Sequence, residues 1–508
     1  MREETMLDHH DPVGGSQVTR GLPGSGDVRG RRIGGILRFL GVPFAEPPVG
    51  ALRFRAPEPV TPWKGVRDAR EYGAWAPQPP HPLDTVLPRH PIPGDDYLTL
   101  NIWASEQAVD APVMVYVHGG SFVTGSGAVP MYDGTTFARN GVVLVTVNYR
   151  LGVDGFLWTG EGAANLGLRD QILALEWVRD NIRAFGGDPS NVTLFGESAG
   201  AASVVSLLAS PLAVNLFHRV IAQSGAGEMA TDQPTAELIA RRLARRLRVE
   251  PTRATIAEVP MDVLLRESDA LAAQVTSQPF QWRWKDAART SLAFLPVIDG
   301  DVLPAQPTEA IRGGMGHDVD LLVGSNTDEA RLFTVPTGLI DHAPPGISRV
   351  LARRYRVPHG RAKASYRRRK NARGRGRVAT ELLTDGLYRV PALRLASVHP
   401  RSYVYEFAWR SPAFEGALRA AHVTELPFVF GTLDDADSSA VVGQSPPRRL
   451  SEQMNGVWRR FAETGDPGWA RFNPTRANMI FDVRSRVEEP DQSVDLALWT
   501  QHGLPTAP

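Results

Sequence analysis

Cysteine is absent from this sequence: none of the 508 residues is a cysteine. Disulfide bonds and thiolate metal sites are therefore excluded, and the chain needs no oxidising compartment in order to fold. Long apolar runs are absent too, since no uninterrupted stretch approaches the ~18 residues that cross a bilayer. Residues 1–10 lack the apolar core of a secretory signal. We expect a cytoplasmic protein with no membrane partner.

An excess of charge of one sign is also missing. The 56 lysine and arginine residues balance the 55 aspartate and glutamate residues, which leaves a formal net charge of +1. Nucleic-acid binding relies on an excess of positive charge that neutralises phosphates, so we expect no nucleic-acid partner. One local exception is the arginine-rich segment 367–377. It could bind an anionic surface or act as a targeting patch, but a solvated loop or helix face is the interpretation we favour.

The sequence Gly196–Gly200 (GESAG) predicts a sharp turn between a strand and a helix. An apolar run over residues 192–195 precedes it, and a stretch of mostly small residues over 201–208 follows it. Glycines are needed on both sides because the turn leaves no room for side chains there, and the start of the helix presents free backbone N–H groups. A serine hydroxyl held in such a turn can attack a substrate, so Ser198 is the candidate nucleophile.

Short runs typical of buried strands alternate with segments of helical character. The runs lie at 113–117, 142–147, 220–222 and 321–323. Between Asn165 and Phe185 apolar residues recur every three or four positions, which predicts a helix that ends at Gly186–Pro189. This alternation predicts a mainly parallel sheet covered by helices.

Charged, helix-favouring residues are enriched in two regions, around 231–297 and 336–392. We expect both regions to be helical insertions that cover the sheet and not independent domains. The predicted organisation is a flexible leader (1–20), a single catalytic domain (21–500) and a C-terminal tail (501–508).

A second glycine-rich segment, Tyr116–Phe122 (YVHGGSF), leaves a predicted strand ahead of the serine turn. Acyl transfer needs N–H donors for the developing oxyanion, and a loop in this position supplies them in serine hydrolases of this organisation. The candidate donors are the backbone N–H groups of Gly120, Ser121 and Ala199. The alternative is that the glycines merely form a turn.

These motifs resemble the type-B carboxylesterase family of α/β hydrolases, which includes bacterial para-nitrobenzyl-type esterases, animal carboxylesterases and cholinesterases. Further matching segments occur in order along most of the chain: Phe39–Gly50, Asp95–Trp103, Asn148–Arg150, Phe185–Pro189, Gln223–Gly225 and Phe461–Pro467. The resemblance implies an α/β-hydrolase fold and hydrolysis of small to medium carboxylic esters through a serine acyl-enzyme. Such chemistry requires neither a metal nor an organic cofactor.

The family's triad acid is a glutamate in a short strand-to-loop motif, which Gly324–Ala330 (GSNTDEA) resembles at Glu329. The end of a sheet strand is also where α/β hydrolases place this carboxylate. Asp328 is the alternative acid, and a plain surface charge at Glu329 is the other. The family usually has glycine where Ala330 stands, which predicts a local backbone adjustment.

Among the twelve histidines, His422 is the candidate base. It follows the acid in sequence, and the segment Ala420–Gly431 resembles the family's histidine segment, with Val423 in place of the usual small residue. His399 also follows the acid but lacks this context. We expect His118 to shape the glycine-rich loop, and a packing role explains His218. The resemblance thus implies a triad of Ser198, His422 and Glu329.

Three departures or open points accompany the resemblance. Relatives commonly carry a disulfide at the positions of Ala76 and Tyr97, so packing and proline must hold this loop here. The stretch 77–96 contains no tryptophan, whereas cholinesterases bind quaternary ammonium groups with one there, so choline esters are not expected substrates. Glu197 either tunes the site electrostatically or hydrogen-bonds to nearby backbone.

Two other functions stay open on the same residues. The triad could act on amides, carbamates or lactones. The chain could also be a catalytically silent binding protein, as neuroligin-like relatives are, although those typically lack the serine. The sequence contains no signal for an oligomeric state, and the expected partner is a small-molecule ester.

Overall fold

The structure is a computed structural model that describes residues 15–278, 281–369, 372–489 and 498–499. The predicted tail and the first fourteen residues of the predicted leader lie outside these ranges. The rest of the leader prediction is wrong, because Ser16–Leu22 forms strand β1 and pairs antiparallel with β2. Val18 and Leu22 point inward from this strand, and their burial holds the segment against the sheet.

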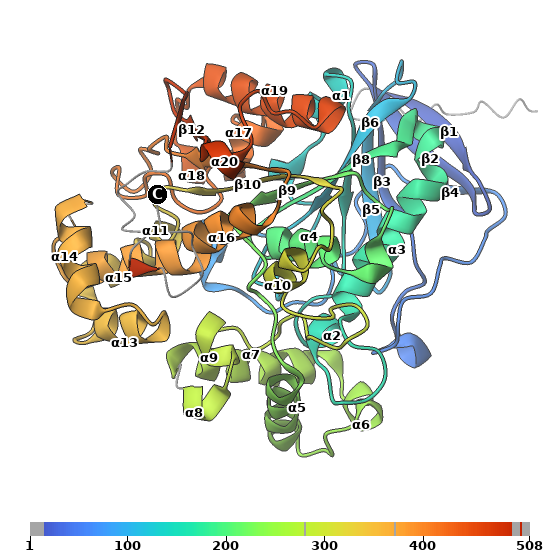
Figure 1. The fold of residues 1–508 in the computed structure, drawn as a ribbon. Coiled ribbons are helices and arrows are strands. Elements are labelled where there is room, and N and C mark those ends of the chain that lie inside the picture. Colours follow the sequence, from blue (N-terminus) through green and yellow to red (C-terminus); the bar gives the residue numbers. More distant parts are fainter. Residues whose placement is uncertain (1–14, 279–280, 370–371, 490–497, 500–508) are drawn as a thin grey trace, which may run out of the picture.

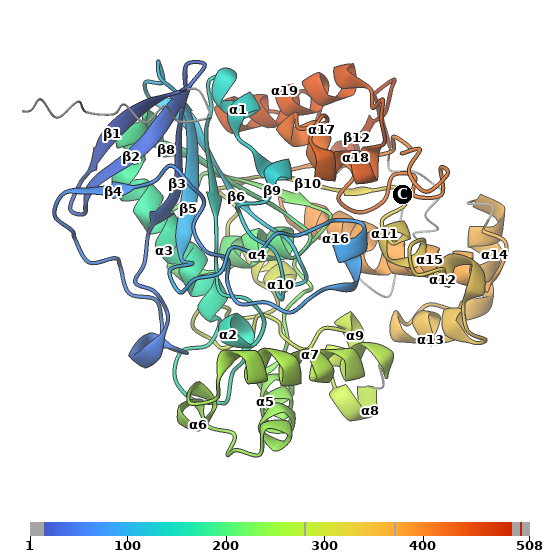
Figure 2. The same cartoon turned by 180° about the vertical axis from the view of Figure 1, so that it is seen from behind.

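A single large sheet forms the centre of the molecule (Figures 1 and 2). The strands, in chain order, are β1 (Ser16–Leu22), β2 (Gly26–Ile33), β3 (Ile36–Pro43), β4 (Val66–Asp68), β5 (Thr99–Ser105), β6 (Ala111–Val117), β7 (Val143–Val147), β8 (Gly187–Glu197), β9 (Arg219–Gln223), β10 (Asp320–Asn326), β11 (Ser402–Phe407), β12 (Asn478–Phe481) and β13 (Arg486–Glu488). Their spatial order is β1-β2-β3-β5-β7-β6-β8-β9-β10-β11-β12-β13, with β4 beside β2.

The strands from β7 through β6, β8, β9, β10 and β11 to β12 run parallel, and antiparallel strands flank them on both sides. Successive side chains of the central strands enter two different apolar cores. Val113 and Val115 of β6 belong to one core, while Met114 and Tyr116 belong to the other. Burial on both faces explains why these strands read as continuous apolar runs in the sequence.

Helices cover both faces of the sheet, as the sequence predicted (Figures 1 and 2). The α-helices are α1 (Thr135–Arg139), α2 (Gly152–Phe156), α3 (Leu166–Asn181), α4 (Ala199–Leu208), α5 (Gln233–Leu247), α6 (Arg253–Ala257), α7 (Met261–Ser277), α8 (Gln281–Trp284), α9 (Ala287–Thr290), α10 (Pro307–Arg312), α11 (Arg331–Thr334), α12 (Leu339–His342), α13 (Ile347–Arg354), α14 (His359–Arg369), α15 (Arg375–Thr384), α16 (Val390–Val398), α17 (Leu426–Phe430), α18 (Ala436–Val442), α19 (Arg448–Thr464) and α20 (Phe472–Thr475). Short helical turns add η1 (Gly50–Leu52), η2 (Pro82–Thr85), η3 (Pro130–Tyr132), η4 (Ile182–Phe185), η5 (Pro211–Ala213) and the π-helical turn η6 (Asp385–Arg389). Helices α3, α4, α10 and α16 lie on one face, and α1, α17 and α19 lie on the other.

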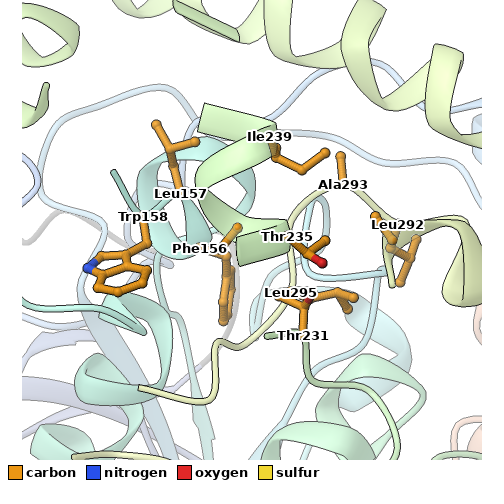
Figure 3. A pocket seen from close by; sticks show the side chains of 11 residues that line it. Phe156, Leu157, Trp158, Thr231, Thr235, Ile239, Leu292, Ala293 and Leu295 are labelled. Atoms are coloured by element: carbon orange, nitrogen blue, oxygen red, sulfur yellow. The ribbon is translucent and has the colours of Figure 1, made fainter. Parts of the chain in front are cut away.

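The two predicted insertions are helical where the structure describes them. The first contains α5 to α9, which lie at the bottom of Figure 1, and the second contains α12 to α15 and the start of α16, which extend to its left edge. A narrow hollow remains where the first insertion meets the core. Figure 3 shows Phe156 and Trp158 on one side of it and Thr235 and Ile239 of α5 on another. The division into domains stays a prediction.

The arginine-rich segment runs from the end of α14 to the start of α15. Within the described residues, Arg367, Arg368, Arg373, Arg375 and Arg377 are all exposed. Arg377 lies 3.7 Å from Asp341, a distance at which two exposed charges contribute little to stability. This arrangement agrees with the expected solvated face. No helix in the described ranges is long and apolar enough to cross a membrane.

A buried ion pair fixes α3 to the end of β7. The guanidinium of Arg150 donates to both carboxylate oxygens of Asp170, with 2.6 Å between Nη2 and Oδ1, and both side chains are fully buried. Asp170 also accepts the backbone N–H of Arg150 at 2.9 Å, and Arg150 donates to the carbonyl of Arg55 at 2.6 Å. With these hydrogen bonds in place, the desolvated charges are compensated.

We predict that Asp170→Asn destabilises the protein by about 3 to 5 kcal/mol, because it leaves the Arg150 guanidinium buried without a counter-charge. The measurement is the shift of the midpoint in urea unfolding. Arg183→Met is the matched control: it removes a pair with Asp110 in which both side chains are mostly exposed, and we expect a loss below about 1 kcal/mol. Equal shifts for the two variants would contradict the prediction.

Candidate active site

Ser198 lies in the sharp turn between β8 and α4 that the sequence predicted. Its backbone has φ 58° and ψ −120°, outside the regions that L-residues normally occupy. A Cβ on Gly200 would lie 2.0 Å from the carbonyl oxygen of Val117, and a Cβ on Gly196 would lie 2.6 Å from the Gly200 backbone. Only glycine fits at either position. The close backbone contacts therefore hold the turn and its serine in one conformation.

His422 and Glu329 come together from loops at the ends of neighbouring strands. Glu329 follows β10, and His422 lies between β11 and α17. The imidazole Nδ1 lies 2.7 Å from Glu329 Oε2, while Glu329 Oε1 accepts the backbone N–H of Asn326 at 2.7 Å. The backbone N–H of His422 also donates to the Glu329 carbonyl at 3.1 Å. These bonds fix the carboxylate and the ring against each other.

The other ring nitrogen of His422 does not contact the serine in the way that the sequence suggested. Its Nε2 lies 3.1 Å from Glu197 Oε1. Among the described residues, no hydrogen bond joins the Ser198 hydroxyl to the imidazole. Both side chains line the same pocket, and in substrate-free enzymes this hydrogen bond is often long and tightens only when substrate binds.

Three buried glutamates surround this single imidazole. Glu197 and Glu329 contact the ring directly. Glu425 lies behind them, where it accepts from the side chains of Asn326 at 2.6 Å and Gln223 at 3.2 Å. Glu197 Oε1 has no hydrogen-bond donor within the described chain, so its interaction with His422 is electrostatic.

The shifts in pKa follow from this crowding. Burial raises the pKa of Glu197 to about 8, an effect that His422 opposes and the other two glutamates reinforce. Burial, with the charge of Glu329, raises the pKa of Glu425 to about 7. Burial alone would lower the pKa of His422, but Glu197 and Glu329 outweigh it and raise the pKa to about 9. The imidazolium is thus stabilised strongly in the resting site.

The predicted glycine-rich loop passes directly in front of the serine turn. A Cβ on Gly119 would meet the Glu197 carbonyl at 2.8 Å and the Ser198 Cβ at 3.1 Å. The backbone at Gly120 and Ser121 has positive φ (111° and 58°). Within the described residues, the N–H groups of Gly120, Ser121 and Ala199 donate to no protein acceptor. These donors are free to bind an anionic oxygen.

His118 supports this loop, as expected. Its Nδ1 lies 2.8 Å from the Gly119 carbonyl, and its ring stacks on Tyr149 with 4.5 Å between centroids. Burial lowers the pKa of His118 to about 4, so the ring is neutral and Nδ1–H donates to the carbonyl. Tyr149 donates to the His118 carbonyl at 2.8 Å.

The alternatives that the sequence left open have other partners. Asp328 accepts from Arg331 at 3.0 Å. His399 lies 3.1 Å from the Gly316 carbonyl, and His218 accepts the backbone N–H of Val192. Ala330, where relatives have glycine, adopts ordinary right-handed helical angles and needs no adjustment.

Val423 behaves differently from Ala330. It takes φ +66°, a conformation that is costly for a β-branched residue. The loop that carries His422 therefore contains local strain at the position where relatives have a small residue.

A pocket opens onto Ser198, His422, Glu197 and the glycine-rich loop. Most of its remaining wall is apolar, with Leu83, Leu87, Met131, Leu332, Phe333 and Leu426 among the lining residues. No group of three or more histidine, aspartate or glutamate side chains in the described chain is arranged to hold a metal ion.

Comparison with known proteins identifies the family. A model of the carboxylesterase family matches residues 17–480. The chain belongs to this family. The para-nitrobenzyl esterase of Bacillus subtilis is 36% identical over 487 residues, which cover 92% of this chain and 96% of that protein. The phenmedipham hydrolase of Pseudarthrobacter oxydans is 36% identical over 463 residues, covering 87% and 89%.

The fold agrees with solved structures of carboxylesterases. A thermophilic PNB esterase superposes with a TM-score of 0.81 at 31% identity, covering 95% of this chain and 99% of that chain. The predicted family and α/β-hydrolase fold are confirmed. This carboxylesterase is a carboxylic-ester hydrolase whose substrates are small-molecule esters.

Sequence reasoning missed two features of the carboxylesterase site. It gave Glu425 no role, although a charged residue directly before the apolar run Leu426–Phe430 was a signal of a buried carboxylate. It also missed the packing of Tyr388 and Phe333 against the His422 ring, at centroid distances of 4.8 and 5.5 Å. Nothing in the local sequence of either aromatic residue pointed to this contact.

We predict that Glu197→Gln moves the acid limb of the pH profile of kcat/KM to lower pH. His422 is the expected base and only its neutral form can accept a proton, so we expect activity to rise as pH rises through its pKa. The carboxylate of Glu197 favours the imidazolium, and its removal lowers the pKa of His422. The measurement is kcat/KM for a para-nitrophenyl ester across pH, with Glu463→Gln, a half-exposed residue on α19, as control. An unmoved acid limb in Glu197→Gln would show that this charge does not tune the base.

Proposed function

We propose that this carboxylesterase hydrolyses esters through an acyl-enzyme on Ser198, with His422 as general base and Glu329 as the carboxylate that orients it. The observation that carries the proposal is the 2.7 Å contact between His422 Nδ1 and Glu329 in the pocket that Ser198 also lines. The proposed oxyanion donors are the N–H groups of Gly120, Ser121 and Ala199, which have no protein acceptor among the described residues.

The reaction follows from these roles. His422 Nε2 takes the hydroxyl proton of Ser198 as the oxygen bonds to the ester carbonyl carbon, and the three N–H groups bind the negative oxygen that forms. The tetrahedral intermediate expels the alcohol, which receives the proton from His422. Water then repeats the sequence: it loses a proton to His422, attacks the acyl carbon and releases the acid and Ser198.

Glu197 has a distinct place in this scheme. With Nε2 beside Glu197 in the resting site, the imidazole must give up this interaction before it accepts the Ser198 proton. A negative charge on Glu197 also stabilises the His422 imidazolium that forms in each transition state. We propose that Glu197 tunes the base, which deepens one of the two interpretations that the sequence left open.

The pocket supports small to medium esters with apolar groups. The pocket opens directly onto Ser198 and His422, as a site for a small ester requires. Its apolar wall would stabilise aryl or alkyl groups by removing them from water, at about 25 cal/mol per Å² buried. The similarity to the Bacillus subtilis enzyme supports para-nitrobenzyl esters as substrates. A cytoplasmic location stays a prediction of the sequence.

A second candidate activity uses the same residues. The 36% identity to a phenmedipham hydrolase supports phenmedipham as an alternative substrate. Hydrolysis of phenmedipham, measured beside para-nitrophenyl esters and matching anilides, separates this candidate from a strict esterase.

We predict that Ser198→Ala lowers kcat for para-nitrophenyl esters by about 10⁴-fold or more, because the nucleophile is lost. The circular dichroism spectrum should be unchanged. In the wild type, a fluorophosphonate probe should label Ser198, and rates for a series of acyl lengths should define the pocket. A folded wild type that gives neither turnover nor a fluorophosphonate adduct would instead support a silent binding protein.

We predict that Glu329→Gln lowers kcat by about 10²- to 10⁴-fold with little change in KM. Glutamine keeps the size of the side chain but removes the negative charge that stabilises the imidazolium. The matched control is Asp328→Asn, one residue away, which alters the pair with Arg331 and not the contact with His422. Loss of activity in Asp328→Asn with retention in Glu329→Gln would reverse the assignment of the acid.

A further inference from the structure

The loop after Trp75 is held by a cluster of polar contacts in the region where relatives have a disulfide. Arg89 lies at its centre, and its guanidinium donates to both oxygens of Asp84, at 2.5 Å from Nε and 2.9 Å from Nη2. Arg89 also donates to the side-chain oxygen of Gln78 and, at 3.2 Å, to the carbonyl of Pro79. The Arg89 side chain is only 12% exposed, so these bonds form in a partly desolvated environment and are stronger than surface pairs.

Asp84 anchors this cluster to η2. Its carboxylate accepts the backbone N–H of His81 at 2.8 Å, and the His81 ring nitrogen accepts the N–H of Leu83 at 3.2 Å, so the two side chains form a capping box. Burial alone would raise the pKa of Asp84, but its hydrogen bonds from Arg89 and from the His81 backbone outweigh it, and the pKa is lowered. The carboxylate is therefore charged at neutral pH.

Gln78 connects the same cluster to residues 119–125, which carry the proposed donors Gly120 and Ser121 and which we call the oxyanion loop. Its side-chain oxygen accepts the backbone N–H of Gly125 at 2.9 Å, and its nitrogen donates to the Gly125 carbonyl at 3.0 Å. The nitrogen also donates to the Ala76 carbonyl at 3.1 Å. Since Arg89 donates to the same oxygen, it fixes the amide in the one orientation that satisfies both backbone groups of Gly125.

Gly125 ends the oxyanion loop. A Cβ on Gly125 would lie 2.5 Å from His118 Nδ1 and 2.6 Å from the Gly119 carbonyl. The backbone of Gly125 thus packs directly against the residues that precede the free N–H groups. A displacement of Gly125 would therefore be transmitted to Gly119 and Gly120, because close-packed atoms leave no room for relaxation.

The other end of the cluster forms part of the substrate pocket. The lining of this pocket includes His81, Leu83, Asp84, Leu87, Pro88 and Arg89. One connected set of contacts, Asp84–Arg89–Gln78–Gly125, therefore joins residues that line the pocket to the loop that would bind the oxyanion. We call this set the clasp.

We propose that Arg89 and Gln78 are positioning residues: the clasp holds the pocket wall and the oxyanion loop in register, so that filling the pocket and stabilising the oxyanion are coupled. This inference rests on the proposed function of Gly120 and Ser121. The chain has no cysteine and therefore no disulfide in this loop. The hydrogen bonds and the ion pair of the clasp hold the loop instead.

The first experiment compares Arg89→Met with wild type in two assays. We expect kcat for para-nitrophenyl esters to fall by about 10- to 100-fold, because displacements of about 1 Å in catalytic groups have effects of this size. The second assay is inhibition by an aryl trifluoromethyl ketone. Its carbonyl carbon bonds to Ser198 Oγ, the serine proton passes to His422, and the resulting oxyanion occupies the site of the free N–H groups. We expect its Ki to rise by a similar factor, while KM changes less than threefold.

Gln78→Glu provides a sharper test in case Arg89→Met is unstable. Glutamate keeps an acceptor for Arg89 and for the Gly125 N–H, so the ion pairs are retained or strengthened, but it replaces the donor to the Gly125 carbonyl by a second acceptor. A purely structural role predicts a stable and active variant, whereas the clasp predicts a stable variant with lower kcat and weaker ketone binding. In Arg89→Ala, added guanidinium should restore part of kcat at concentrations that leave the unfolding midpoint of the variant unchanged, which separates positioning from repair of the fold.

Arg460→Met is the matched control, because it removes an exposed arginine paired with Asp466 at 3.1 Å on the far end of α19. It should leave kcat and Ki unchanged. Wild-type Ki and kcat in both Gln78→Glu and Arg89→Met, with an active wild type and an inactive Ser198→Ala, would overturn the clasp and leave the proposed function intact. An inactive wild type would overturn the proposed function itself.

Discussion

The hydrogen bond between His422 and Glu329 is the interaction on which the site depends. It joins two loops that leave β10 and β11, neighbouring parallel strands whose register pairs Leu321 with Ser402. Side-chain and backbone bonds run between the same two residues, so neither can rotate without the other. The fold supplies the adjacency, because carboxyl ends of parallel strands meet at one edge of a sheet.

Charge around this bond is balanced closely. An imidazole among three buried glutamates would be locked as a cation if all of them were ionised, yet burial raises the pKa of Glu197 and of Glu425. The protons of the group are therefore shared, and the titration belongs to the cluster more than to any one residue. The negative charge of the cluster favours the imidazolium, so His422 accepts a proton readily in its neutral form.

Much of this architecture could be predicted from the sequence. The run of residues 192–208 gave the strand, turn and helix around Ser198, because glycine is the only residue that fits at Gly196 and Gly200. The strands were readable because they are buried on both faces, and the resemblance supplied Glu329 and His422. The contact between Glu197 and His422 could not be read, since it depends on a rotamer and not on a pattern. The pairing of Arg89 with Gln78 could not be predicted either, because it also depends on side-chain rotamers. Strand β1 was missed because apolar and polar residues alternate only weakly along it.

The pocket wall is held by the ion pair between Asp84 and Arg89 and by the Gln78 amide, and not by a disulfide. Thiol reductants have no disulfide to cleave in it, because the chain has no cysteine. The wall is sensitive to acid instead. Protonation of Asp84 would release Arg89, and the Gln78 amide that binds Gly125 would lose the donor that orients it. The order of this wall therefore depends on the acidity of the solution and not on disulfide chemistry.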